Sequence, residues 1–218
     1  MRLILSTIAL ILAASSLGRA QQWEIGGLGG FGWYRNSTIR NSITFSPPLS
    51  AEVGFPSRGT FGAFFGQNPH RHWGGEVRWL YQSGGPQIEL NNVKTSMTGY
   101  SNLFAYDVLA YPLKRESGFR PYIAGGVGVK AYTGTGFRFI GQESTAVLAL
   151  LRPVTEAEVA IGVGGGLKYL FGKHVLVRVD FRTYFTPTPD DVIRRTRFTV
   201  TRGWLHEFVP TAGLGYAF

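Results

Sequence analysis

Charged side chains recur at every second position in several stretches of this sequence, with apolar residues between them. The clearest stretch is 175–185, VLVRVDFRTYF, in which Arg178, Asp180 and Arg182 alternate with valine and phenylalanine. Successive side chains of a β-strand point to opposite faces, so the stretch predicts a strand with one apolar and one charged face. Opposite charges on a shared face would form ion pairs or line a polar path.

The preceding stretch, 156–171, has the same alternation and adds glycine. Its polar set consists of Glu156, Glu158, Lys168 and small residues, most of them glycine. A tight turn at 172–174 would join the two stretches into a hairpin. Glycine weakens a strand and usually marks the close approach of another group. A narrow closed barrel explains the pattern best, because glycine makes room for large polar side chains inside while the apolar face contacts lipid.

The first 20 residues have the features of a secretory signal peptide. Arg2 forms a basic start, an apolar run follows to Ala14, and small residues precede a cleavage site after Ala20. The apolar run is too short to span about 30 Å of hydrocarbon as a helix. We therefore expect residues 1–20 to be removed and residues 21–218 to form one barrel domain.

Eight stretches of the mature chain alternate in this way. They are 23–34, 60–66, 73–82, 100–113, 122–133, 156–171, 175–185 and 204–218. The connections between them are alternately long and short, which is typical of an up-and-down transmembrane barrel with short turns at one end. The long connections, which we predict as loops, are 36–50 or 36–58, 84–98, 134–155 and 186–203. The predicted fold class is therefore all-β, an eight-stranded antiparallel up-and-down transmembrane β-barrel.

In such a barrel the charged faces of the strands would meet inside the lumen. An isolated charge in a narrow lumen is costly, whereas a paired and hydrogen-bonded charge is tolerated. The near balance of signs predicts a network of ion pairs that plugs the lumen, and the alternative is a narrow polar path. The residues predicted to face the lumen are Glu24, Glu76, Arg78, Asp107, Lys130, Glu156, Glu158, Lys168, Arg178, Asp180, Arg182 and Glu207.

The end of the chain resembles the C-terminal signature of bacterial outer-membrane proteins. Leu214, Tyr216 and Phe218 alternate with small residues in TAGLGYAF, and the last residue is aromatic. Together with PYIAGGVGVKAY at 121–132 and the stretch 175–185, this makes the mature chain resemble the small outer-membrane β-barrel family. It is similar to the transmembrane domain of outer-membrane protein A, without that protein's periplasmic peptidoglycan-binding domain. The resemblance implies a Gram-negative outer-membrane location and recognition of the C-terminal strand by the barrel-assembly machinery.

The chain is basic, with a formal charge of +9 that falls to +7 when the signal peptide and its two arginines are removed. The positive residues are spread over loops and turns rather than gathered on one face, which disfavours a nucleic-acid partner. We expect the partners to be outer-membrane lipids, including lipopolysaccharide. Arg194, Arg195 and Arg197 are the candidate contacts to lipid phosphate. We expect the protein to be a monomer.

The sequence offers little for catalysis or for holding a metal or cofactor. It contains no cysteine, and His70 and His72 form a pair without further ligands. A lipid-modifying enzyme would need a nucleophile and a base at the outer rim, but only His206 among the histidines is predicted near that end. We expect no catalytic site, no metal and no cofactor, and a structural, surface-interaction or minor permeability role. The alternatives are a porin-like solute channel, a lipid-modifying enzyme and a soluble lipocalin-like carrier.

Overall fold

A computed structural model describes most of the chain. The described residues are 23–41, 50–90, 93–113, 118–136, 149–172, 174–195, 199–202 and 204–218. The predicted signal peptide lies outside them. Every regular element in these segments is a β-strand. No described helix is long and apolar enough to cross a membrane.

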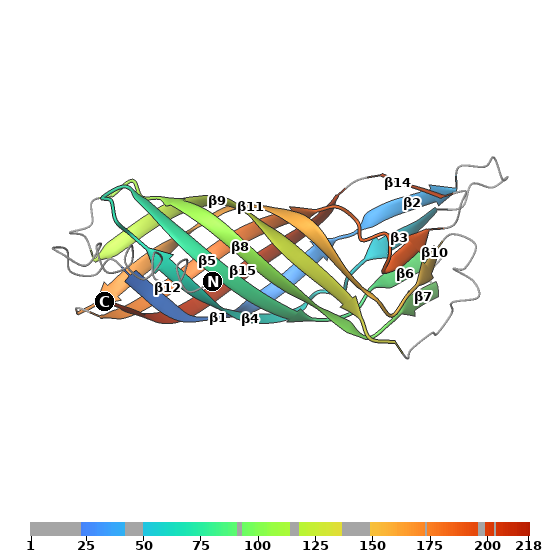
Figure 1. Cartoon of the computed structure of the whole chain (residues 1–218), viewed down its shortest axis with the longest axis horizontal. Coiled ribbons are helices and arrows are strands. Elements are labelled where there is room, and N and C mark those ends of the chain that lie inside the picture. Colours follow the sequence, from blue (N-terminus) through green and yellow to red (C-terminus); the bar gives the residue numbers. More distant parts are fainter. Residues whose placement is uncertain are drawn as a thin grey trace, which may run out of the picture.

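Eight long strands close into one antiparallel barrel (Figure 1). Each pairs with the next long strand along the chain, and the last pairs with the first. This confirms the predicted fold class, although the second strand is longer than predicted, with 10 residues. The barrel strands are β1 (Trp23–Arg35), β4 (Arg58–Gln67), β5 (Trp73–Ser83), β8 (Gly99–Ala110), β9 (Phe119–Gly134), β11 (Thr155–Phe171), β12 (Val175–Thr186) and β15 (Leu205–Ala217).

The side chains of β12 show how the sequence pattern becomes two faces. Val179 points outward and keeps 49% of its surface exposed, whereas Leu176 points inward and keeps 2%. The hairpin register places Asp180 opposite Gly166 and Arg178 opposite Lys168 on the inner face. The outer face of the barrel is apolar on every strand, as a lipid-facing wall must be.

The second barrel strand carries three phenylalanines in five residues, and its register decides which of them face outward. In β4, Phe61 and Phe65 point outward, while Phe64 is buried in the lumen. The Arg178 guanidinium lies 4.4 Å from the centre of the Phe64 ring, a cation–π contact. The alternation of β4 is therefore regular, and the inward phenylalanine helps to fill the barrel.

Aromatic rings gather on the outer wall near both ends of the barrel. Near the end with the long connections, Tyr81 stacks on Tyr100 with ring centres 5.7 Å apart. Near the end with the short turns, Trp23 stacks on Phe65 at 5.1 Å. Amphipathic aromatic rings prefer the boundary between hydrocarbon and headgroups, so the two groups are placed as the girdles of a membrane barrel are.

The long connections contain strands, which the prediction of plain loops did not include. Five of these strands form one sheet in the order β14-β2-β3-β6-β7, and the other two pair with each other. Figure 1 shows them beyond one end of the barrel, the end opposite the C-terminus. We call these seven strands the cap: β2 (Ser37–Asn41), β3 (Ser50–Gly54), β6 (Gln87–Leu90), β7 (Val93–Ser96), β10 (Ala149–Leu151), β13 (Ile193–Arg195) and β14 (Thr199–Arg202).

The cap has an apolar core of its own. Ile39, Val53 and Ile88 of the larger sheet are fully buried in one cluster with Ile193 of the smaller sheet. The cluster also reaches the barrel, where Tyr132 of β9 belongs to it. The cap is therefore packed like a small water-soluble domain, because most of its described apolar side chains point inward rather than outward.

Candidate functional site

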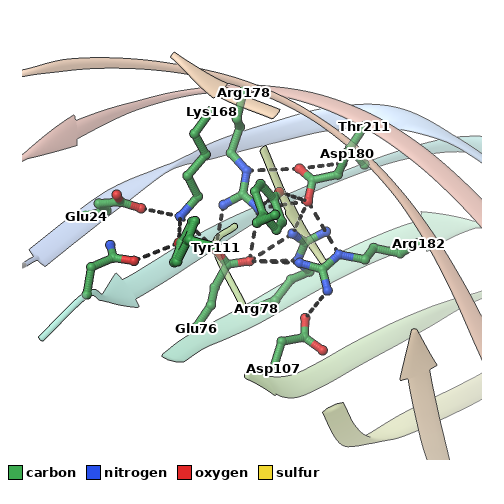
Figure 2. A network of polar contacts seen from close by, with 12 residues as sticks. Glu24, Glu76, Arg78, Asp107, Tyr111, Lys168, Arg178, Asp180, Arg182 and Thr211 are labelled. Atoms are coloured by element: carbon green, nitrogen blue, oxygen red, sulfur yellow. Dashed lines mark hydrogen bonds and ion pairs between the residues drawn. The ribbon is translucent and has the colours of Figure 1, made fainter. Parts of the chain in front are cut away.

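The charged residues predicted for the lumen form a compact network in the middle of the barrel (Figure 2). β5 supplies Glu76 and Arg78, and β12 supplies Arg178, Asp180 and Arg182. All five are at most 5% exposed. In the closed strand order, β5 and β12 lie four positions apart in either direction, so they are on opposite walls. Contacts between these two strands therefore cross the full width of the lumen.

Glu76 forms ion pairs with one arginine from each of the two walls. Arg178 Nη1, from the opposite wall, lies 2.5 Å from Glu76 Oε2. Arg78 Nη2, from the same strand, donates to Glu76 Oε1 at 2.8 Å. Charge-assisted bonds of this kind are stronger than those between neutral groups, which favours a fixed arrangement of the three side chains.

Asp180 bonds to the same two arginines, Arg178 from its own strand and Arg78 from the opposite wall. Arg178 Nε donates to Asp180 Oδ2 at 2.9 Å, and Arg78 Nη2 donates to Asp180 Oδ1 at 2.7 Å. The Tyr122 hydroxyl of β9 donates to Asp180 Oδ1 at 2.5 Å. Two carboxylates and two arginines thus form a closed square across the barrel, with tyrosine as an additional donor.

Two further ion pairs extend the square. Towards the short-turn end, Lys168 Nζ of β11 lies 2.5 Å from Glu24 Oε2 of β1, and it donates to the Tyr111 hydroxyl at 3.0 Å. On the other side, Arg182 Nη1 lies 3.2 Å from Asp107 Oδ2 of β8. The charged members of the network therefore come from every barrel strand except β4, β9 and β15. β9 contributes the Tyr122 hydroxyl, and β15 contributes the Thr211 hydroxyl, which donates to Asp180 at 3.4 Å.

A second group of polar side chains lies nearer the cap. Lys130 of β9 pairs with Glu207 of β15 and donates to the Tyr34 hydroxyl at 2.7 Å. Tyr34 in turn donates to Gln82 Oε1 at 2.8 Å. The predicted residues Lys130 and Glu207 thus face the lumen but form a pair separate from the central network.

Glycines on the inner face of β11 make the room that these side chains occupy. A Cβ atom at Gly164 would lie 2.8 Å from Arg182 Cδ, and one at Gly166 would lie 2.7 Å from the Tyr122 hydroxyl. Real Cβ atoms do not approach other atoms so closely, so no larger residue fits at these positions without displacing the network. The glycine run of the sequence and the charged residues opposite it are parts of one arrangement.

The central network balances its charges. It contains four carboxylates, Glu24, Glu76, Asp107 and Asp180, and four cations, Arg78, Lys168, Arg178 and Arg182, so its formal charge is zero. A buried charge is tolerated when it is paired and hydrogen-bonded, and removing one partner leaves the other uncompensated. This arrangement can hold opposite walls together and fill the lumen, and the loss of any single member would destabilise it.

Two further predicted lumen residues join neither the central network nor the Lys130–Glu207 pair. Glu156 lies at the cap end of β11, where its carboxylate accepts hydrogen bonds from the backbone N–H groups of Asp190, Asp191 and Val192. Glu158 is half-buried beside it. Alternation predicts the face of a strand but not the depth along the barrel, and both residues lie above the central network.

Some residues of the lumen were not predicted. Arg120 is 9% exposed, and its guanidinium lies 3.9 Å from the centre of the Tyr111 ring. The sequence prediction assigned Arg120 to a turn, but β9 begins at Phe119. Tyr111 and Tyr122 bond directly to charged members of the network. Their inward position follows from the same alternation, so the signal was present for the tyrosines.

Among the other predicted site residues, the side chains that the structure describes lie on the outside. Arg194 is exposed in the cap, the side chain of Arg195 is not described, and Arg197 lies outside the described residues. Leu214, Tyr216 and Phe218 all point outward and are at least half exposed. Their recognition by the assembly machinery stays a prediction.

The histidines and the carboxylates do not form a metal site in the described part of the chain. His72 Nδ1 and His174 Nδ1 each lie 2.9 Å from a backbone carbonyl oxygen, that of Tyr111 and that of Ala217. The His206 ring packs edge-on against Phe185, with ring centres 4.7 Å apart. These contacts orient the imidazoles at the two ends of the wall.

Comparison with known proteins finds likeness in structure but not in sequence. No protein-family model matches the chain, and no curated protein matches it significantly. The crystal structure of Neisserial surface protein A matches with a TM-score of 0.59 and 10% identity, covering 92% of this chain and 100% of that one. The fold is that of the small outer-membrane β-barrels.

Two further solved structures share this barrel fold. Outer membrane protein OprG from Pseudomonas aeruginosa matches with a TM-score of 0.56 and 16% identity, covering 92% of this chain and 98% of that one. Outer membrane protein AlkL, solved in lipid bilayers, matches with a TM-score of 0.53 and 14% identity, covering 93% of both chains. At identities this low, the comparison shows a shared fold and says nothing about a shared role.

Proposed function

We propose that this protein resides in a bacterial outer membrane as a closed barrel, and that it carries the folded cap at the cell surface. The apolar outer wall with its two aromatic girdles supports the membrane location. The barrel-assembly machinery would read the outward-facing C-terminal strand, and the short turns would lie on the periplasmic side. The role is structural or surface-interactive, and the protein performs no catalysis.

The ion pairs that cross the lumen are the main support for the proposal that the lumen is blocked. Arg178 of β12 reaches Glu76 of β5 on the opposite wall, and the exposed fractions of these side chains are 0%. An eight-stranded barrel has an interior just wide enough for side chains to fill. The network occupies that width at mid-barrel, and the Lys130–Glu207 pair adds a second obstruction nearer the cap.

A narrow polar path is the second candidate, and one observation favours it. Asp107 Oδ1, Arg182 Nη2 and the Tyr184 hydroxyl are buried without a hydrogen-bond partner among the described residues, and Asp107 Oδ2 meets Arg182 Nη1 only in the ion pair described above. Buried polar groups in proteins are usually satisfied, and ordered water is a common partner. Water around Asp107 would give the lumen a short hydrated segment on the cap side of the network.

Conductance across a planar bilayer distinguishes the two candidates. We expect the wild-type barrel to give no steady current, because the network closes the lumen. The double variant Glu76→Ala, Arg178→Ala removes the pair that joins opposite walls and is expected to conduct more. A current from this variant also serves as the positive control that the procedure inserts the barrel into the bilayer. A large steady wild-type current would contradict the closed barrel and support the channel.

A heat-modifiability gel tests the barrel itself. Folded membrane barrels resist unfolding by detergent until they are heated, so unheated and heated samples should migrate differently. Identical migration of detergent-folded and heated protein would contradict a membrane barrel and favour a soluble carrier.

A further inference from the structure

A cavity of about 510 Å³ lies at the junction of barrel and cap, outside the lumen network. It is formed where β4, β5 and β8 of the barrel meet the cap strands β6 and β7. Figure 1 shows β6 and β7 beyond the end of the barrel. A volume of this size is in the usual range for small-ligand sites. Neither the closed lumen nor the membrane wall requires a cavity here.

Backbone packing builds the walls of the cavity. Gly84 has a φ of 125°, and a Cβ atom there would lie 2.8 Å from Pro56 Cγ. The Gly84 N–H donates to the Gly99 carbonyl at 2.9 Å, and the Met97 N–H donates to the Pro86 carbonyl at 3.0 Å. The segments on either side of the cavity are thus tied together by main-chain bonds, which fix the backbone that carries the lining side chains.

The polar groups of the cavity match an anion that also carries hydroxyl groups. Arg58 and Lys94 line it and are exposed, and neither forms an ion pair with another described residue. No acidic residue is among the described residues that line it. Lysine and arginine bind phosphate, and hydroxyl and amide groups bind the hydroxyls of a sugar. The polar lining residues besides the two cations are Ser83, Gln87, Ser96 and Thr98.

The position of the cavity indicates where its ligand comes from. Ser83 at its edge pairs with Tyr100 across the sheet, and Tyr100 stacks on Tyr81 in the girdle near the cap. The cavity therefore lies directly beyond the aromatic rings. If the girdle marks the hydrocarbon boundary, as the proposed outer-membrane location requires, the cavity lies at the depth of lipid headgroups.

We propose that this cavity binds the phosphorylated sugar headgroup of an outer-leaflet glycolipid, with Arg58 and Lys94 holding the phosphate. This site is distinct from Arg194, Arg195 and Arg197, the arginines that the sequence suggested. Arg194 lies in β13, which belongs to the smaller cap sheet rather than to the cavity wall. The inference rests on the proposed outer-membrane location for the source of the ligand, and on the cavity for its chemistry.

Methionine offers a selective reporter for binding. The chain contains two methionines, and Met97 lines the cavity. We expect lipid A, titrated into full-chain protein in a neutral detergent, to shift the 13C-methyl NMR signal of Met97 saturably. The double variant Arg58→Gln, Lys94→Gln should weaken the binding about tenfold or more, since it removes two charge-assisted contacts. Dephosphorylated lipid A should bind as weakly to wild-type protein as intact lipid A does to the double variant.

Two control substitutions, each removing one positive charge elsewhere, test whether position matters. Arg71→Gln removes a positive charge at the short-turn end, and Arg194→Gln removes one from the cap away from the cavity. Both should bind lipid A like the wild type. Equal weakening by Arg194→Gln, or no Met97 shift with lipid A, would overturn the site. Equal affinity for glucosamine 1-phosphate would overturn the lipid as its source. A normal heat-modifiability gel with no Met97 shift would reject the cavity while leaving the proposed barrel intact.

Discussion

The barrel and the cap differ in the charged side chains that they bury. The barrel buries Arg78, Arg178 and Glu76 beside an apolar cluster that includes Leu176, while Val179 faces outward. In the cap the core is apolar, with Ile39 and Ile88 buried, and charged residues face outward. One chain therefore folds against two surroundings, with a charged network inside the apolar wall and an apolar core inside the polar surface. The burial of a residue alone does not tell which chemistry a core will have.

The largest effect is expected from removing a buried charge in the lumen. Glu76→Ala would leave Arg78 and Arg178 without one of their two carboxylates. Breaking a buried ion pair in this way typically costs about 3–5 kcal/mol. Urea unfolding of the barrel in lipid vesicles measures the loss. Glu89→Ala on the exposed face of the cap is the matched control, expected within about 0.5 kcal/mol of wild type.

The second-largest effect is expected from a valine-to-arginine substitution on the outer wall of the barrel, compared with the same substitution in the cap. Val179→Arg places a charge on the apolar wall, and near the midplane it should cost about 2–4 kcal/mol. Val93→Arg on the cap strand β7, also an exposed valine, should change the unfolding free energy by less than about 0.5 kcal/mol. Equal small losses for both would mean that water, not lipid, surrounds the barrel.

A smaller effect on the barrel is expected from truncating a side chain in the apolar core of the cap. Ile88→Ala removes a fully buried side chain and should destabilise the cap locally by about 2–5 kcal/mol. The barrel keeps its own contacts, so its urea midpoint should barely move. Limited proteolysis should show faster cleavage within the cap, with the barrel fragment protected. Loss of the barrel at the same urea concentration as the cap would show that the two regions unfold as one.

The smallest effect is expected at the junction of the two regions. Glu156→Ala removes the acceptor for the N–H groups of Asp190, Asp191 and Val192. We expect hydrogen exchange of these three amides to accelerate, with no change in barrel stability, because the bonds lie outside the lumen. Glu158→Ala is the neighbouring control and should leave these three amides as protected as in the wild type.

The sequence was sufficient for the barrel because one rule applies along every long strand. Alternation placed Arg178, Asp180 and Arg182 on the inner face, and the long and short connections indicated an up-and-down order. The same rule assigned Glu156 to the correct face but could not give its depth. It did not specify pairing across the lumen either, since contacts such as Arg178 with Glu76 join residues 102 positions apart.

The cap could not be predicted for a different reason. Its strands have three to five residues, too few for a clear period, and β14 pairs with β2 although the two are far apart in sequence. Its core draws two to four buried apolar residues from each connection. The proposed glycolipid cavity has the same origin, because Arg58 and Lys94 are brought together only by the folded cap.

Contacts with lipid test the central proposition most directly. Two residues of β12 serve as a pair: Val179, half exposed on the wall, and Leu176, buried inside. In lipid bicelles we predict nuclear Overhauser effects between the methyl groups of Val179 and the acyl-chain protons, and none for Leu176. Val179 methyls that contact water or other protein side chains instead of acyl chains would contradict a barrel with lipid outside and charges within.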